Sequence, residues 1–287
     1  MRPLALILLT CSVLTSAGLA QTPIEAIPYL GQTPPGNTPV IFAPGVISKG
    51  NIHSRLEISS DGREMYWNTV DMSTFSTQIL SVCIVDGKWS SPEPPAFAQG
   101  GNSQAATFSP DGKKLFFRID AGDGWVARYV ERTAAGWSAP RSDGHMLKAS
   151  SSFTTAGRVY FSSTMTTKVW NSGIFGARYA AEGYADIVPL DETINVPQAI
   201  DYTPYISPDE SFLLFASNRP RLDDKEDLYV HVSFHQSDGS WSAPRRVCDI
   251  QARFPSLSPD GKYLFFCGDD GNIYWVDATL VDALKDG

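Results

Sequence analysis

The sequence predicts an all-β protein in which one four-stranded unit recurs about every 50 residues. Three observations carry this prediction: a recurring Ser-Pro-Asp-Gly segment, an apolar triplet that follows it, and a later turn that places a tryptophan before a proline. A fixed period of this length is typical of architectures that repeat one supersecondary unit. The 287 residues, 43% hydrophobic and 11% aromatic, are enough to bury a substantial core.

The Ser-Pro-Asp-Gly segment marks the first turn of each unit. Five copies align, of which the third is degenerate: residues 59–62, 109–112, 154–157, 207–210 and 258–261. Each copy is followed by an apolar triplet, such as Leu115, Phe116 and Phe117 in the second unit. Asp-Gly pairs favour tight turns because glycine adopts positive φ angles without steric cost. We therefore expect this segment to join the first and second strands of each unit.

The later turn marks the end of each unit. It places Trp-Ser and then a proline at residues 87–92, 136–140 and 239–244, with a weaker copy at 183–189. Between the two turns we expect the third strands, at residues 79–85, 125–130, 174–179, 228–234 and 273–276. Proline cannot donate to a ladder, so the fourth strand should lie at the outer edge of its sheet. Since Trp89, Trp137 and Trp241 recur with the fold, we expect them to pack between adjacent sheets.

Together these units predict a five-bladed β-propeller of four-stranded antiparallel blades. The fifth unit ends after its third strand, whereas residues 39–44 have the aromatic, small and proline order of an outer strand. We expect this N-terminal strand to complete the last blade and close the ring. A sixth blade would have to fit within residues 21–55, which are too few. The predicted organisation is a signal peptide at 1–20, a linker at 21–37, the propeller at 38–278 and a tail at 279–287.

The Ser-Pro-Asp-Gly-Lys-x-Leu-Phe-Phe segments at residues 109–117 and 258–266 resemble the WD40-like propeller repeat of the TolB type, found in many exported bacterial proteins. The resemblance covers roughly residues 38–278 and implies a propeller fold. This sequence departs from the pattern at Glu210, which replaces the turn glycine, and in the third unit, which lacks Ser-Pro-Asp. The repeat occurs in scaffolds, peptidase-associated domains and carbohydrate-active enzymes, so the resemblance implies no single activity.

The N-terminus indicates export. Arg2 supplies a positive start, residues 4–9 are apolar, and residues 16–20 are mostly small, which is the pattern of a signal peptide cleaved after Ala20. We expect a periplasmic or secreted protein. Lipid attachment at Cys11 is the alternative, although Thr10 stands where such signals usually have Gly, Ala or Ser. No later stretch approaches the roughly 18 to 20 apolar residues of a membrane helix.

The net charge limits the classes of possible partner, and the cysteine content limits the possible disulfides and metal sites. A net charge of -8 argues against a basic surface for nucleic acid. Removal of the signal leaves Cys83, Cys248 and Cys267 without any Cys-x-x-Cys spacing. They are free thiols in strands, or two of them form a disulfide. We expect a monomer whose partner is a protein or a saccharide or anionic ligand.

The candidate site follows from the predicted fold, because the first strands of a propeller line its central channel. The positions six to eight residues before the fourth motif position give the predicted binding residues, which are His53, Arg55, Gln104, Lys148, Asp201, Tyr202 and Arg253. Four potential cations and one acid suit an anionic or polyhydroxylated ligand. The alternative is that these side chains only hydrate the channel. A second polar set follows the second strands and is interpreted as turn residues: Asn68, Arg118, Ser162, Ser163, Asn218, Arg219, Asp269 and Asp270.

Motifs for catalysis are weak. His231 and His235 are four residues apart, but in a strand and without the glutamate of a zinc-protease helix. Glu57 and Asp201 are the carboxylates that could face the channel as a glycosidase pair. The acidic segment 223–227 is interpreted as a solvated loop and Trp170 as an exposed aromatic. We therefore predict a non-catalytic binding or protein-interaction module without metal or cofactor; the alternative is a carbohydrate hydrolase or lyase that acts in the channel.

Overall fold

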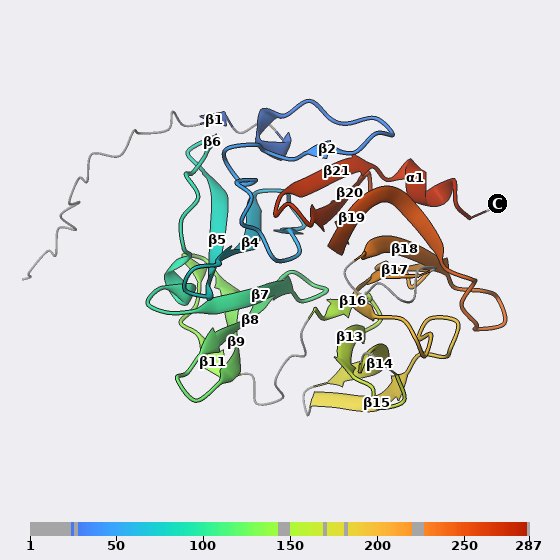
Figure 1. Ribbon diagram of the computed structural model, residues 1–287. Helices are drawn as coiled ribbons and strands as arrows, with labels where there is room; N and C mark the ends of the chain where they lie inside the picture. The colour runs from blue at the N-terminus through green and yellow to red at the C-terminus, as the bar shows by residue number, and fades with distance from the viewer. Residues whose placement is uncertain are drawn as a thin grey trace, which may run out of the picture.

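The structure, a computed structural model, describes residues 24–25, 28–142, 150–168, 171–180, 183–219 and 227–285. The predicted signal peptide, Lys148, Trp170 and most of the acidic segment 223–227 lie outside the described residues. Within them the chain is built from antiparallel sheets, which stand side by side around a common centre (Figure 1). The prediction of an all-β protein with a propeller-like arrangement is confirmed at this level.

The first three sheets follow the predicted units in order. The first contains β3 (Glu57–Ile58), β4 (Glu64–Asp71), β5 (Ser76–Val85) and β6 (Lys88–Trp89), with β1 (Ile24–Glu25) added beyond β6. The second contains β7 (Ser103–Phe108), β8 (Lys114–Asp120), β9 (Trp125–Thr133), β10 (Gly136–Trp137) and β11 (Arg141–Ser142). The third contains β12 (Ser152–Phe153), β13 (Arg158–Thr164), β14 (Ser172–Ala180) and β15 (Gly183–Pro189).

The last two predicted units share one seven-stranded sheet. Its strands are β16 (Asp201–Ile206), β17 (Phe212–Ser217), β18 (Tyr229–Phe234), β19 (Arg245–Leu257), β20 (Tyr263–Gly268), β21 (Ile273–Asp277) and β2 (Val40–Ile41). The long strand β19 is both the last strand of the fourth unit and the first of the fifth. Strand β2 pairs with β21, Val40 opposite Trp275, so the predicted pairing between the N-terminal segment and the last unit is present.

The outer edge of the first sheet differs from the prediction. Strand β1 pairs with β6, Ile24 opposite Trp89 and Glu25 opposite Lys88, so β6 is not the edge strand there. The proline that was expected to prevent such pairing is Pro92, three residues beyond the paired segment. Because Lys88 and Trp89 keep their own N–H groups, the ladder can form before the proline is reached.

Hydrogen bonds inside the Ser-Pro-Asp-Gly turns explain why the motif recurs. The Ser109 hydroxyl donates to Asp111 Oδ1 at 2.6 Å and accepts from the Lys114 N–H at 2.9 Å, and the turns at Ser59 and Ser258 repeat this pattern. Gly112 has a φ of 65°. The Ser109 hydroxyl and the Lys113 N–H lower the pKa of Asp111 by stabilising its charged form. The motif is therefore a self-contained turn.

Glu210 takes the place of this turn glycine at a left-handed φ of 62°. Its Oε1 atom accepts a hydrogen bond from the Tyr160 hydroxyl at 2.5 Å and lies 3.0 Å from Arg158 Nε. Both partners belong to β13 in the third sheet. The departure from the repeat pattern thus gives a polar contact between two sheets, at the cost of backbone strain.

The recurring tryptophans pack between sheets, as predicted. Trp89 is 2% exposed, and Trp241 meets the Tyr160 ring edge-on with centroids 6.2 Å apart. Trp137 Nε1 donates to the Tyr66 hydroxyl of the first sheet at 2.9 Å. These aromatic side chains fill the wedge between neighbouring twisted sheets.

Segments assigned to a linker and a tail also pack. The turn η1 (Pro28–Gly31) buries Leu30 against the first and last units, and α1 (Thr279–Asp282) buries Val281. One further turn, η2 (Ala96–Ala98), buries Phe97 between the first two sheets. Cys83, Cys248 and Cys267 are free thiols, and burial raises the pKa of Cys267 to about 12.

Candidate functional site

The first strand of three of the units carries a β-bulge beside a central cavity. The strand register shifts between Gln104 and Thr107 in β7, between Tyr202 and Tyr205 in β16, and between Arg253 and Ser256 in β19. One residue in each bulge has a left-handed φ: Ala105 (59°), Thr203 (52°) and Phe254 (58°). Non-glycine residues in this region are strained and require support from their surroundings.

That support comes from side chains of the neighbouring unit. Asn68 Oδ1 accepts from the Ala105 N–H at 3.0 Å, and Ser162 Oγ accepts from the Thr203 N–H at 2.8 Å. Thr203 Oγ1 in turn accepts from the Phe254 N–H at 3.2 Å. Asn68 and Ser162, interpreted from the sequence as turn residues, therefore couple the bulges at Ala105 and Thr203 to the sheet before each, and Thr203 couples the bulge at Phe254 to the fourth unit.

The bulges surround a cavity of about 270 Å³, which we call the channel pocket. Of the predicted binding residues, His53, Arg55, Gln104 and Tyr202 line it. Asp201 and Arg253 are not among its lining residues, and Lys148 lies outside the described residues. The structure thus brings together part of the predicted set.

Arg55 lines the channel pocket, but its guanidinium is already bonded to other groups of the protein. Its guanidinium donates to the carbonyl oxygens of Pro255 at 3.0 Å, Ser151 at 2.9 Å and Pro204 at 2.5 Å. Its Nη1 atom also lies 3.5 Å from Glu57 Oε1. The Arg55–Glu57 pair is buried between the channel pocket and a second cavity of about 150 Å³. Arg55, which was expected to bind a ligand, therefore links the inner segments of different units through hydrogen bonds.

The carboxylate of Asp201 is likewise bonded to other side chains of the protein. It is fully buried, and its carboxylate accepts from Lys168 Nζ at 2.5 Å, Ser217 Oγ at 2.7 Å and Arg219 Nη2 at 2.5 Å. Successive side chains of a strand point to opposite faces, so its neighbour Tyr202 lines the pocket while Asp201 does not. Glu57 and Asp201 sit in separate ion-pair networks, which does not suit the two-carboxylate chemistry of a glycosidase.

His53, Tyr202 and Arg253 form the outer side of this region. His53 is exposed and meets the Phe254 ring edge-on at 5.1 Å; desolvation and then repulsion from Arg253 lower its pKa. Burial raises the pKa of Tyr202 to about 12, so its phenol stays protonated at neutral pH. Arg253 is paired with Asp269.

Arg118 lines the channel pocket, although its place after the second strand predicts a turn residue. It lies directly opposite Gln104 in the β7–β8 ladder, and both side chains line the channel pocket. Within the described part of the chain, the Arg118 side chain has no hydrogen bond or ion pair, only a contact with the Trp125 ring at 5.8 Å. Desolvation lowers its pKa, but a guanidinium remains charged at neutral pH. The sequence predicts a turn residue here because the apolar triplet ends at Phe117, whereas β8 continues to Asp120.

The charge balance of the channel pocket is positive. Arg118 and Arg55 are its cations, and none of its described lining residues is Asp or Glu. His231, by contrast, is buried with Nδ1 2.9 Å from the Tyr229 carbonyl oxygen, and burial lowers its pKa to about 4. Among the described residues no three His, Cys, Asp or Glu side chains form a potential metal site.

Comparison with known proteins gives similarities to solved structures alone. No protein-family model and no curated protein matches the chain. A putative TolB from Agrobacterium tumefaciens is 17% identical, covering 77% of this chain and 71% of that one, with a TM-score of 0.49. An α-L-arabinofuranosidase from Lactobacillus brevis is 14% identical (80% and 90% covered, TM-score 0.48), and a gluconolactonase from Xanthomonas campestris 11% (90% and 98%, 0.46). Each identity is below 25%, and each TM-score is below 0.5. No helix of the described chain is long and apolar enough to cross a membrane.

Proposed function

We propose that this protein is an exported, non-catalytic propeller module that binds a small anionic ligand in the channel pocket. The observation that carries the proposal is Arg118, a partly desolvated cation in the pocket with no ion-pair partner among the described residues. A desolvated guanidinium without a counter-charge favours binding of a carboxylate or phosphate, to which it can donate two parallel hydrogen bonds.

The neighbouring side chains support an oxyanion ligand. The side chain of Gln104, opposite Arg118, makes no hydrogen bond within the described residues, so its amide is available to a ligand. The neutral phenol of Tyr202 supplies a further donor. A cavity of about 270 Å³ limits the ligand to a small molecule or to one charged group of a larger one.

The scaffold we propose is a five-bladed propeller in which β19 contributes to the fourth and fifth blades and β2 completes the fifth. This arrangement would fix the bulges around one axis and keep the pocket preorganised. The N-terminal pattern of residues 1–20 supports export to the periplasm or the medium. In these compartments small organic acids and charged saccharides are accessible ligands.

Thermal unfolding in the presence of phosphate, citrate and glucuronate, with neutral glucose as the reference, tests the proposal. A ligand at 100 times its Kd stabilises the folded state by about 2.7 kcal/mol, which corresponds to a shift of about 5 °C for a protein of this size. We expect a shift with at least one anion and its loss in Arg118→Gln. Arg178→Gln, which removes an exposed arginine paired with Asp186, is the matched control. Equal shifts in both variants, or no shift with any anion, would refute the assignment.

A further inference from the structure

The seam between the first and last units differs from two other seams in containing a large cavity. Between the first and second sheets, Arg132 binds Glu64 through two hydrogen bonds of 2.6 and 2.8 Å. Between the third sheet and β16–β17, the Thr155 N–H and hydroxyl both donate to the Pro208 carbonyl oxygen. Between the first and last units, by contrast, lies a cavity of about 780 Å³, which we call the seam groove.

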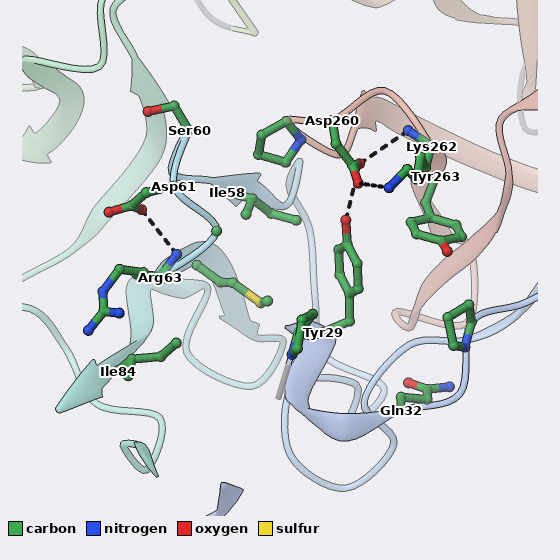
Figure 2. Close-up of a pocket in the computed structure, with 15 residues that line it drawn as sticks. Tyr29, Gln32, Ile58, Ser60, Asp61, Arg63, Ile84, Asp260, Lys262 and Tyr263 are labelled. Atoms are coloured by element: carbon green, nitrogen blue, oxygen red, sulfur yellow. Dashed lines mark hydrogen bonds and ion pairs between the residues drawn. The ribbon is translucent and has the colours of Figure 1, made fainter. Parts of the chain in front are cut away.

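The seam groove has an apolar floor and a polar rim. Ile58, Met65 and Ile84 from the first sheet form the apolar part, and the two Asp-Gly turns of Asp61 and Asp260 form the rim. Tyr29 stands between these turns, with its hydroxyl directed at Asp260 (Figure 2). The groove is thus a mixed surface that includes one central aromatic ring.

The ring of Tyr29 is held in place. Its hydroxyl donates to Asp260 Oδ1 at 3.2 Å, and its ring meets Tyr263 edge-on with centroids 5.1 Å apart and tilts against Trp275 at 5.5 Å. Tyr29 is nevertheless only half-buried. A fixed and partly exposed aromatic ring gives contact area without a large loss of side-chain entropy on binding.

The rim carries balanced charges. Asp61 and Arg63 stand on one side, and Asp260 and Lys262 on the other, so each side offers both acceptors and donors. The Arg63 guanidinium is exposed and makes no hydrogen bond or ion pair within the described residues. A rim without net charge does not select for ions, but it can hydrogen-bond a neutral molecule that carries many hydroxyl groups.

We propose that the seam groove binds a neutral saccharide, with one sugar ring packed on Tyr29 and its hydroxyl groups bonded to the rim. The apolar face of a pyranose suits an aromatic ring beside an aliphatic floor, and a volume of about 780 Å³ accommodates a short oligosaccharide. This site is independent of the anion site proposed in the channel pocket, because the two cavities share no lining residue.

Isothermal titration of the mature protein with cellotetraose, maltotetraose and chitotetraose tests the proposal. We expect at least one to bind. Tyr29→Phe keeps the ring and loses the bond to Asp260, so its Kd should stay within about threefold of the wild-type value; Tyr29→Ala loses the ring and should weaken binding by about tenfold or more. Arg63→Ala, an exposed substitution, keeps the test valid if Tyr29→Ala does not fold, and should weaken binding by about threefold.

Arg118→Gln separates the two proposals, because it should abolish anion binding and leave saccharide binding unchanged. The saccharide assignment is overturned if none of the three probes binds at millimolar concentration. It is also overturned if Tyr29→Ala and Arg63→Ala both bind as wild type, or if Arg118→Gln removes saccharide binding. If a neutral tetrapeptide binds and none of the sugars does, the groove is a polypeptide site, and the proposal is overturned.

Discussion

The buried guanidinium of Arg55 ties together segments of the first, third and seven-stranded sheets, so its removal should be among the most destabilising single changes. Arg55→Met keeps an unbranched side chain but leaves Glu57 buried without its partner. Breaking a buried ion pair in this way costs about 3 to 5 kcal/mol, and three carbonyl groups lose a donor at about 1 kcal/mol each. Water from the two adjoining cavities can hydrate part of these groups, so we expect a loss of about 5 kcal/mol.

Equilibrium unfolding in guanidinium chloride, followed by tryptophan fluorescence and circular dichroism, measures this loss. The double variant Arg55→Met with Glu57→Gln removes the unpaired charge and should recover about 2 to 3 kcal/mol. Arg178→Met, an exposed arginine, should change the free energy of unfolding by less than about 0.5 kcal/mol. A loss below about 1 kcal/mol for Arg55→Met would refute the view that this guanidinium is structural, and would return Arg55 to the set of ligand-binding candidates.

Two further predictions concern stability. Burial lowers the pKa of His231 to about 4, so between pH 6.5 and pH 4 the unfolded chain binds a proton that the native state does not. The free energy of unfolding therefore decreases as the pH falls from 6.5 towards 4, whereas above pH 6.5 this loss is absent. The loss is about 3 kcal/mol. As the pH is lowered below 6.5, the melting temperature should fall less steeply in His231→Gln than in the wild-type protein; equal slopes in the two proteins would contradict this account. Deletion of residues 21–47 removes β1, β2 and the fully buried Phe42, which packs on Trp275 at 5.1 Å. The unfolding midpoint in denaturant should fall markedly, and an unchanged midpoint would mean that these strands contribute nothing to the seam.

The strands were predictable because local chemistry repeats. Each Ser-Pro-Asp-Gly copy encloses its own hydrogen bonds, so the turn forms from residues within five positions of one another. The predicted third strands coincide with β5, β9, β14, β18 and β21 to within a few residues. The pairing of β2 with β21 was predictable from what the last unit lacked. By contrast, the pairing of β1 with β6 depends on two residues without any distinctive pattern, so the sequence offered no signal for it.

The site was predicted less well, because sequence spacing gives a position on a strand but not what the side chain meets. The bulges in β7, β16 and β19 shift the alternation of inward and outward residues by one, and no sequence rule marked Ala105, Thr203 or Phe254 as left-handed. Asp201 was expected in the channel and lies instead in a buried network with Lys168 and Arg219. These three residues are distant in sequence, so only the folded chain shows that their charges compensate one another.

Arg55 and Arg118 show what decides whether a charged residue can serve a ligand. Both are arginines that line the channel pocket, and both are partly or wholly desolvated. Arg55 has already exchanged its water for three carbonyl groups and a carboxylate, so a ligand could bind it only by displacing those partners. Arg118 has lost water without gaining a polar partner among the described residues, so an incoming anion would regain for it the hydrogen bonds that folding removed. A ligand therefore gains more from Arg118 than from Arg55, which is why the anion assignment depends on the residue that the repeat pattern alone did not single out.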